Sequence, residues 1–372
     1  MSKKLYIIAG EASGDLHGSN LIKALKEEEN DLVINAWGGE KMEQAGASIR
    51  KHYRDLAFMG FTEVLMNLKT IMKNLRFCKE DILAFQPDAL ILIDYPGFNM
   101  RIAEWAHKQG IKVLYYISPQ IWAWKKNRVF KLKKTVDKMF VILPFEKDFY
   151  KQYEMDVDFV GHPLMDEIDA FKKTAITRQE FNNKNNLSEQ DIIAMVPGSR
   201  KQEIAKILPE LLNVVNDFPD HQFILGAAPS IEDGFYQSIL EGYNVKIIRD
   251  QTYDLFYHAK AGMVASGTAT LEAAIFGLPE VVCYKGSAIS IFIARRVINV
   301  KYISLVNLIM DQEMVKELIQ SDLNRKNLTL ELKYLLDPMN KDSIADNYQK
   351  LREKLGGIGA SSNAAKAMLK SL

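Results

Sequence analysis

Short apolar runs alternate with amphipathic helical patterns along nearly the whole chain, and no other feature of the sequence restricts its fold so strongly. Runs that are typical of buried strands lie at 5–9, 33–37, 89–93, 112–116, 138–142, 158–160, 192–196, 222–227, 245–248, 262–265 and 281–284. Helical patterns separate them at 15–28, 63–85, 99–108, 145–153, 202–218, 253–258 and 270–276. Strands that are buried on both faces and connected through helices form parallel sheets. The sequence therefore predicts an α/β fold with doubly wound sheets.

Chain length and a change in composition predict two such domains. The 372 residues exceed the usual size of one domain, and the alternation breaks near 163–185, where the chain becomes polar. We expect Rossmann-like domains over 1–165 and 166–345 that face one another across a cleft, and a helical tail over 346–372 that packs back on the first domain. In this arrangement the loops after the carboxyl ends of the strands carry the chemistry.

Charge and composition exclude several classes of protein. The formal net charge of +1 argues against nucleic-acid binding through bulk charge. Cys78 and Cys283 lie far apart in apolar patterns, which predicts free buried thiols in a reducing compartment. No window approaches the roughly 18 uncharged apolar residues that a transmembrane helix needs. The first apolar run leads directly into a glycine turn, so we do not expect a signal peptide.

Two small-residue turns in the second half each follow an expected strand and open a helical pattern. They are Pro197-Gly198-Ser199-Arg200 and Ser266-Gly267-Thr268-Ala269-Thr270-Leu271-Glu272. A helix that starts in such a turn offers free backbone N–H groups beside the positive end of its dipole, which suits a phosphate. We predict a nucleotide diphosphate site here, with Arg200 on the diphosphate and Glu272 on the ribose diol.

The loop after the first strand is Gly10-Glu11-Ala12-Ser13-Gly14-Asp15. It lacks the G-x-G-x-x-G spacing of a dinucleotide fingerprint. Its two carboxylates would repel a pyrophosphate, so the loop suits an acceptor with hydroxyl groups better. The alternative is a plain strand-to-helix turn in which Ser13 or Asp15 caps the helix.

Asp94 ends an apolar strand and precedes Tyr95-Pro96-Gly97-Phe98-Asn99. A carboxylate at the mouth of a buried strand is costly unless it is paired or functional. We predict that Asp94 is a general base that accepts the proton of an attacking hydroxyl. The alternative is an aspartate that caps its own turn.

Two segments of the first half predict contact with lipid. Trp122 and Trp124 lie beside the basic run that contains Lys125, Lys126 and Arg128, a pattern typical of an interfacial anchor on an anionic membrane. The alternative is a solvated basic face with core tryptophans. The segment at 58–68 is more apolar than one helix face requires, and its flexible side chains could receive acyl chains. Its candidate lipid contacts are Phe58, Met59, Phe61 and Leu65.

No metal site is expected. Asp156-Val157-Asp158 resembles the Asp-x-Asp clamp of some glycosyltransferases, but an exposed strand start is the favoured interpretation, and nothing else has metal-ligand spacing. His17 and His162 lie near expected strand ends, and a lone histidine is more often a structural residue than a catalyst.

Motifs in one order over most of the chain resemble the lipid-A-disaccharide synthases, glycosyltransferases of GT-B architecture (family 19). They are Gly10–Asp15, Ile93–Asn99, Tyr116–Trp124, Leu143–Glu146, Phe159–Pro163, Pro197–Arg200, Ser266–Glu272 and Ser304–Leu308. The family often has a second carboxylate where Gly97 stands and a proline where Val306 stands, so a role for that second acid cannot be carried over.

The resemblance implies a reaction and roles for residues. UDP-2,3-diacylglucosamine would donate its sugar to 2,3-diacylglucosamine 1-phosphate at the cytoplasmic face of the inner membrane, with UDP-sugar as a substrate and no cofactor. Asp94 would be the base, Arg200 would neutralise the diphosphate and Glu272 would bind the ribose. Sugar or acceptor contacts are expected from Glu11, Ser13, Asp15, Asn99 and Asn307. The sequence leaves open whether the chain forms a homo-oligomer.

Three other functions remain open at this stage. A peptidoglycan-type UDP-GlcNAc transferase and a UDP-GlcNAc 2-epimerase share the expected fold, and a non-catalytic nucleotide-sugar or lipid-binding module is a different class. The apolar segment at 58–68 and the basic run favour an acylated, anionic acceptor over the first two. Asp94 argues against a pure binder, which gains nothing from an unpaired acid near a diphosphate.

Overall fold

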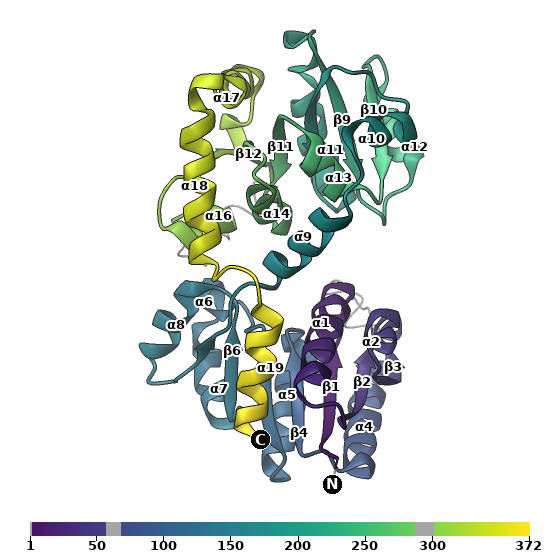
Figure 1. The fold of residues 1–372 in the computed structure, drawn as a ribbon, viewed down its shortest axis with the longest axis vertical. Coiled ribbons are helices and arrows are strands. Elements are labelled where there is room, and N and C mark those ends of the chain that lie inside the picture. Colours follow the sequence, from purple (N-terminus) through teal and green to yellow (C-terminus); the bar gives the residue numbers. More distant parts are fainter. Residues whose placement is uncertain (1, 57–67, 287–300) are drawn as a thin grey trace. The chain divides into compact units, whose positions relative to one another are not determined.

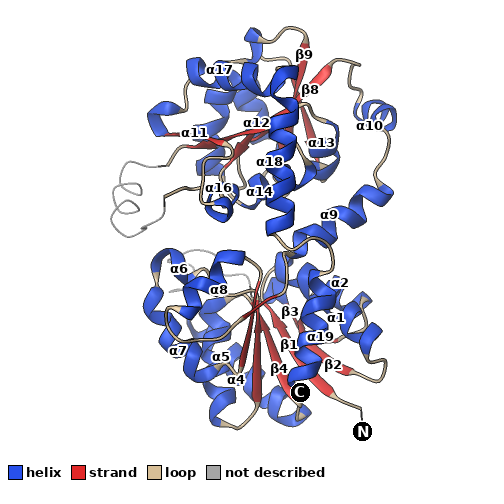
Figure 2. Ribbon diagram, turned by 60° about the vertical axis from the view of Figure 1, so that its left-hand side comes forward, coloured by secondary structure: helices blue, strands red, loops and turns tan. Residues whose placement is uncertain are grey.

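The structure, a computed structural model, describes residues 2–56, 68–286 and 301–372. The chain forms two compact units, Met1–Asp166 with Leu355–Leu372, and Glu167–Lys354. Each unit is a parallel sheet with helices on both faces (Figures 1 and 2). The predicted α/β fold is confirmed. The expected tail at 346–372 is divided, since its first nine residues belong to the second unit and the remainder to the first.

The first unit contains a seven-stranded sheet in the order β3-β2-β1-β4-β5-β6-β7. Its strands are β1 (Lys4–Ala9), β2 (Val33–Gly38), β3 (Ser48–His52), β4 (Ala89–Ile93), β5 (Lys112–Tyr116), β6 (Lys138–Val141) and β7 (Asp158–Phe159). Its helices are α1 (Ala12–Glu28), α2 (Glu40–Gln44), α4 (Leu68–Phe85), α5 (Pro96–Lys108), α6 (Ile121–Trp124), α7 (Val129–Thr135), α8 (Pro144–Lys151) and α19 (Ala360–Ser371), with 3-10 turns at Tyr53–Asp55 and Lys126–Arg128. Helix α9 (Pro163–Thr174) leads from this unit into the second.

The second unit contains a six-stranded sheet in the order β10-β9-β8-β11-β12-β13. Its strands are β8 (Asp191–Val196), β9 (His221–Ala227), β10 (Val245–Arg249), β11 (Ala261–Ala265), β12 (Glu280–Tyr284) and β13 (Lys316–Ile319). Its helices are α10 (Arg178–Asn185), α11 (Lys201–Leu212), α12 (Asp233–Leu240), α13 (Thr252–His258), α14 (Thr268–Phe276), α16 (Leu305–Met310), α17 (Arg325–Leu336) and α18 (Lys341–Lys354), with 3-10 turns at Val215–Asp217, Gln320–Asp322 and Pro338–Asn340.

The central strands are apolar throughout because both faces of each sheet are covered. In β1, Tyr6 and Ile8 pack in one core cluster, whereas Leu5 and Ile7 pack in another. All four side chains are fully buried. Successive side chains of a strand point to opposite faces, so a strand between two helical layers needs apolar residues at every position. Cys78 and Cys283 are buried free thiols, as predicted.

Two edge strands, β3 and β13, were not predicted. Their sequences are Ser-Ile-Arg-Lys-His and Lys-Glu-Leu-Ile, and each lies at the end of its sheet. An edge strand has a neighbour on one side and remains partly in contact with water, so charged residues are tolerated and discourage pairing with other chains. Without an apolar run, the sequence pattern gave no signal for either strand.

The end of the chain packs on the first unit through α19, whose Ala364, Ala365 and Met368 join the core beside α1 (Figure 1). Asp166 fixes the start of this helix, because its carboxylate accepts hydrogen bonds from the backbone N–H groups of Gly359 and Ser361. A carboxylate at a helix N-terminus satisfies free N–H groups and complements the helix dipole.

Candidate active site

In each sheet the strand order reverses between two central strands, and ligands of open α/β sheets bind outside the carboxyl ends of such a pair. In the first unit the pair is β1 and β4, so the loop at Gly10–Glu11 adjoins Asp94. In the second unit the pair is β8 and β11. The turns predicted to hold a phosphate, after Val196 and Ala265, therefore share one edge of the sheet.

A cavity of about 300 Å³ lies at this edge of the second unit. Its lining includes most of the residues that the sequence predicts for nucleotide binding, namely Gly198, Ser199, Ser266, Gly267, Thr268, Ala269 and Glu272. Further lining comes from the ends of β8 and β9 and from Thr252 at the start of α13. The structure thus brings together turns that are about seventy residues apart in the sequence.

The backbone at the start of α14 exposes the N–H groups of a first helical turn. Gly267 precedes the helix with an extended φ of 167°, and a Cβ added there would meet nothing within 4 Å. Neither conformation nor packing within the described residues therefore requires a glycine. The hydroxyl groups of Ser266 and Thr270 donate to backbone carbonyls of Ile303 and Gly267, so they stabilise the turn itself.

The other turn has a glycine for a conformational reason. Gly198 has a φ of +117°, and an added Cβ would lie 2.2 Å from Oε2 of Glu203. Glu203, in the first turn of α11, accepts a hydrogen bond from the Ser199 N–H at 3.1 Å and also lines the cavity. Sequence reasoning missed Glu203, although its spacing of four residues from Ser199 was a usable signal.

Arg200 is not among the residues that line the cavity. It occupies the N-cap position of α11 and is exposed. Within the described part of the chain its side chain has no hydrogen bond or ion pair. The structure places it next to Ser199, at the rim of the predicted phosphate site.

Glu272 reaches the cavity from α14, and two titratable groups act on its carboxyl group. They are Tyr253 of α13 and Glu167, and the Tyr253 hydroxyl donates to Oε1 of Glu167 at 2.9 Å. Burial, and then the nearby Glu167 carboxylate, raise the pKa of Glu272 to about 7, while Tyr253 opposes the shift. Neither Tyr253 nor Glu167 was predicted, because both are distant from Glu272 in the sequence.

Asp94 lies at the carboxyl end of β4 in a left-handed conformation, with φ of 42°, and Tyr95 follows with φ of 48°. Such backbone is uncommon outside glycine and clusters at functional sites. The Asp94 carbonyl accepts hydrogen bonds from the Tyr115 hydroxyl at 2.6 Å and from Asn99 Nδ2 at 2.8 Å. Asp94 is exposed at the surface of its unit, but the protein that surrounds its carboxyl group, and then the nearby Glu11 carboxylate, raise its pKa to about 6.

Three residues predicted to contact acceptor or sugar instead bind the protein's own backbone. The Asn99 amide donates to the carbonyls of Ile93 and Asp94, and its side chain is fully buried. The Asp15 carboxylate accepts from the N–H groups of Gly39, Lys41 and Met42, which begin α2. A buried polar group is costly unless it is paired, and here the neighbouring backbone supplies partners for the Asp15 carboxylate and the Asn99 Nδ2, so both side chains have a role in the fold.

Asn307 is the third residue that was predicted to contact the sugar or acceptor and that binds groups of the protein itself. Its Nδ2 donates to the Val315 carbonyl and to Glu317, each at 2.9 Å. Its Oδ1 accepts from the N–H groups of Met314 and Val315. The side chain is fully buried and joins the start of α16 to the start of β13. The two remaining residues of this group, Glu11 and Ser13, are exposed at the start of α1.

The basic run has both exposed and packed members. Lys125 and Lys126 are exposed, and Arg128 is partly exposed. The ring of Trp122 packs edge-on against Phe145, with centroids 4.9 Å apart, and its indole nitrogen is buried. Trp122 is thus a packing residue in this structure. The side chain of Trp124 and the residues Phe58, Met59, Phe61 and Leu65 lie outside the described part.

Sequence reasoning missed a buried polar network in the first unit, in the segments that follow the carboxyl ends of β5 and β6. The hydroxyls of Ser118 and Tyr150 are 2.6 Å apart. Burial raises the pKa of Glu146 to about 8, although the Leu143 N–H, Ser118 and Trp122 interact with its carboxyl group.

The two histidines noted in the sequence, His17 and His162, are buried as well. Burial lowers the pKa of His17 to about 4 and that of His162 to about 3, so both imidazoles are neutral at physiological pH.

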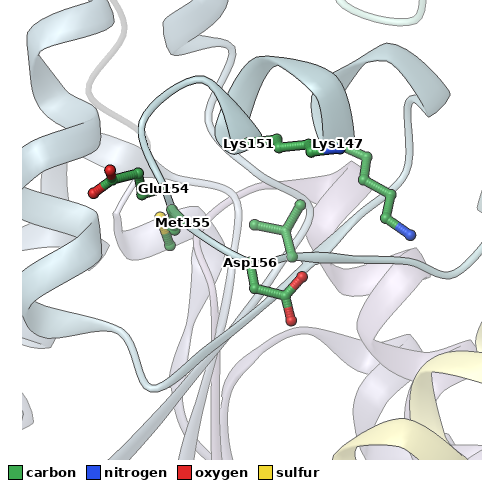
Figure 3. A pocket seen from close by; sticks show the side chains of 6 residues that line it. Lys147, Lys151, Glu154, Met155 and Asp156 are labelled. Carbon is green, nitrogen blue, oxygen red and sulfur yellow. The ribbon is translucent and has the colours of Figure 1, made fainter.

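Asp156 precedes the short strand β7 and Asp158 begins it. Both carboxylates contact Nζ of Lys138, at 3.5 and 3.2 Å. Asp156 lines a pocket of about 390 Å³ with Lys147 and Lys151 (Figure 3). This pocket adjoins the amino end of β7, whereas Asp94 follows the carboxyl end of β4. In the parts of the chain that the structure describes, no three His, Cys, Asp or Glu side chains are arranged to hold a metal ion.

None of the described helices combines the length and the apolar character that would let it cross a membrane.

Solved structures place the chain in a class of folds. A UDP-GlcNAc 2-epimerase from Neisseria meningitidis, solved with bound UDP-GlcNAc, is 14% identical, with a TM-score of 0.66 over 99% of both chains. The glycotransferase of kitacinnamycin is 13% identical, with a TM-score of 0.69 over 100% of this chain and 99% of that one. Together with the two parallel sheets, these likenesses define the GT-B architecture of two Rossmann-like units.

Comparisons at the level of sequence identify the family. A family model described as lipid-A-disaccharide synthetase matches residues 5–371. The lipid-A-disaccharide synthase of Syntrophus aciditrophicus is 39% identical over 98% of this chain and 96% of its own. That of Geobacter sulfurreducens is 37% identical over 100% of this chain and 98% of its own. The chain belongs to the lipid-A-disaccharide synthetase family.

Proposed function

We propose that the chain transfers 2,3-diacylglucosamine from its UDP derivative to the 6-hydroxyl of 2,3-diacylglucosamine 1-phosphate. The products are a β-1,6-linked, tetra-acylated disaccharide 1-phosphate and UDP, and the step belongs to lipopolysaccharide synthesis. The observation that carries the proposal is the family match over residues 5–371. The chemistry available at the two strand-order reversals supports it.

In this proposal the second unit binds the UDP moiety. The free N–H groups at the start of α14 receive the diphosphate, and the space around Gly267 allows its close approach. Arg200, exposed beside the cavity, adds positive charge as the UDP departs. Glu272 accepts hydrogen bonds from the ribose hydroxyls. We propose that these groups stabilise the leaving diphosphate without a metal ion.

The first unit supplies the base. An α-linked donor that gives a β-linked product reacts with inversion, most simply in one displacement. Asp94 takes the proton of the acceptor hydroxyl while the new bond to the anomeric carbon forms and the bond to the UDP oxygen breaks. A carboxylate with a pKa of about 6 is mostly ionised at neutral pH and is a stronger base than an ordinary aspartate. Exposed Glu11 and Ser13 are available to the acceptor sugar.

Both proposed substrates carry acyl chains, so we propose that the chain works in the cytoplasm, in peripheral contact with the anionic surface of the inner membrane. The exposed residues Lys125 and Lys126 support this placement, as does Phe130, which is 56% exposed on the same segment. Cationic side chains beside exposed aromatic rings bind anionic interfaces.

The test is release of UDP from UDP-2,3-diacylglucosamine, measured in detergent with EDTA, with and without 2,3-diacylglucosamine 1-phosphate. We expect release that depends on the acceptor, and a fall of roughly 10²–10⁴ in rate for Asp94→Asn. Release that does not need the acceptor would indicate hydrolysis, and conversion of UDP-GlcNAc to its 2-epimer would indicate an epimerase. Full turnover by a folded Asp94→Asn variant would remove Asp94 from the role of base.

A further inference from the structure

A carboxylate lies in the turn after β8, one of the two turns that the sequence predicts for phosphate binding. Glu203, in the first turn of α11, lines the nucleotide cavity together with Gly198 and Ser199. Its Oε2 accepts a hydrogen bond from the Ser199 N–H at 3.1 Å. This N–H group therefore already has an anionic partner, and the turn presents a negative side chain to the cavity.

The local backbone holds the carboxylate in place. Gly198 has a positive φ, and an added Cβ there would lie 2.2 Å from Oε2 of Glu203, so the glycine leaves room for the carboxylate. The hydrogen bond from Ser199 satisfies an N–H group that precedes the helix. In the described part of the chain, the other oxygen of Glu203, Oε1, makes no hydrogen bond. A hydroxyl group of a ligand can donate to this oxygen, whereas an ionised phosphate has no proton to donate.

The charged side chains of the cavity lining have one sign. Among the described residues that line the cavity, Glu203 and Glu272 are acidic, and none is Lys, Arg or His. Arg200 lies outside this lining and is exposed. The positive potential within the cavity comes from the start of α14, where a helix dipole is equivalent to roughly half a unit charge. This potential offsets part of the charge of a diphosphate and leaves none for further phosphate charge.

We propose that Glu203 is a specificity-determining residue that selects a UDP-sugar over nucleotides that end in a free phosphate. Both phosphates of a UDP-sugar are linked on two sides, whereas a terminal phosphate carries a second charge above a pH of about 6. At neutral pH, UDP therefore exceeds a UDP-sugar by about one negative charge, and UTP exceeds it by about two. This inference rests on the proposed function, since it assumes that the cavity receives the UDP moiety.

The selection follows from charge and hydrogen-bonding capacity together. Repulsion by a fixed carboxylate grows with each negative charge on the ligand, and like charges brought together in a binding site exclude the wrong ligand. A sugar in the place of a terminal phosphate removes that charge and offers hydroxyl groups to Oε1 of Glu203. Because UDP is the product of the proposed reaction, the same repulsion limits inhibition by the product.

The experiment is calorimetric titration of the full chain with UDP and with UTP at pH 8 in EDTA, together with the KM for UDP-2,3-diacylglucosamine. We expect the unmodified chain to bind UTP about tenfold more weakly than UDP. Glu203→Gln should bind both nucleotides more tightly, UTP by the larger factor, so that the difference largely disappears. The KM should be nearly unchanged, because glutamine keeps an oxygen that accepts from the Ser199 N–H or from a sugar hydroxyl.

Two further variants separate the charge of Glu203 from its role in the turn. Glu210→Gln is the matched control, because Glu210 lies on the same helix, pairs with Lys285 and is not among the residues that line the cavity. It should leave the ratio of the UDP and UTP affinities unchanged. Glu203→Ala should lose the preference as Glu203→Gln does, and should also unfold at a lower temperature, because the Ser199 N–H loses its partner.

An unmodified chain that binds UTP as tightly as UDP would overturn the inference. A folded Glu203→Gln variant with an unchanged ratio of the two affinities would overturn it as well, and would leave Glu203 with a role in the turn alone. Failure of the unmodified chain to bind UDP is a separate result, because it contradicts the proposed function before any variant is compared.

Discussion

Asp94 is the candidate base, and its backbone has a left-handed conformation that depends on hydrogen bonds from neighbouring residues. Two donors, Asn99 and Tyr115, bind its carbonyl and stabilise the left-handed turn. The polar residues nearest the candidate base therefore fix its position, whereas the sequence motif suggested that Asn99 contacts the substrate. A polar residue in a sequence motif serves either a ligand or its own fold, and the motif alone does not show which contact the side chain makes.

The pKa of Asp94 sets the acid limb of the pH profile. The folded-state pKa is about 6, above the ordinary value of 3.8, so the carboxylate becomes protonated and inactive as a base below about pH 6. We expect kcat/KM to fall about tenfold per pH unit there. Glu11→Gln removes a negative neighbour and should shift the limb to lower pH, whereas Ser13→Ala in the same loop should not. A limb that stays in place in Glu11→Gln, or that persists in Asp94→Asn, contradicts this assignment.

A substitution at Gly267 should affect UDP binding without affecting the stability of the fold. An alanine there has an acceptable φ and open space for its Cβ, so the free energy of unfolding should change by less than about 1 kcal/mol. The methyl group would nevertheless occupy the approach to the free N–H groups of α14. We expect Gly267→Ala to weaken UDP binding at least about tenfold, or about 1.4 kcal/mol, in a titration with UDP. A clear loss of stability with unchanged affinity would show that the glycine serves the fold.

At the scale of elements, sequence reasoning located the central strands and the turns that follow them, because a strand covered on both faces must be apolar and must end before a polar residue. This is how Asp94 and the turn at Ser266–Glu272 were found. It failed for the polar edge strands β3 and β13. It also could not find the contact of Tyr253 with Glu167, since the two residues are 86 positions apart and meet only when α9 and α13 pack.

Replacement of Asn307 tests whether this side chain stabilises the packing of two elements or binds a substrate. Its amide satisfies groups of both α16 and β13, and Asn307→Ala leaves Glu317 and several backbone groups with fewer partners. Each buried polar group left unpaired costs about 1–3 kcal/mol. We expect a lower denaturant midpoint for unfolding, with UDP affinity nearly unchanged in the fraction that remains folded. Normal stability combined with lost turnover would return Asn307 to a substrate-binding role.

At the scale of the whole molecule, alternation of strands and helices predicted parallel sheets but not the order of strands within them. The order decides which loops are neighbours, and it depends on packing between segments distant in sequence. In the second unit it brings the turns after β8 and β11 to one cavity. In the first it brings Glu11 and Asp94 together. We assign the nucleotide site to the second unit and the base to the first because the strand order of each sheet reverses next to these residues.

Hydrogen exchange of the full chain tests that assignment. Each unit has core clusters of its own, so UDP bound in one unit stabilises that unit against opening. At a concentration of about 100 times Kd the stabilisation is about 2.7 kcal/mol, and amides that exchange through opening of the second unit should slow about 100-fold. The N–H groups of Thr268 and Ala269 should gain further protection by direct contact. Residues 2–56 and 68–166 should keep their rates. Equal slowing in both units would instead mean that they open together, and slowing confined to the first unit would place the nucleotide at Asp94 and overturn the assignment.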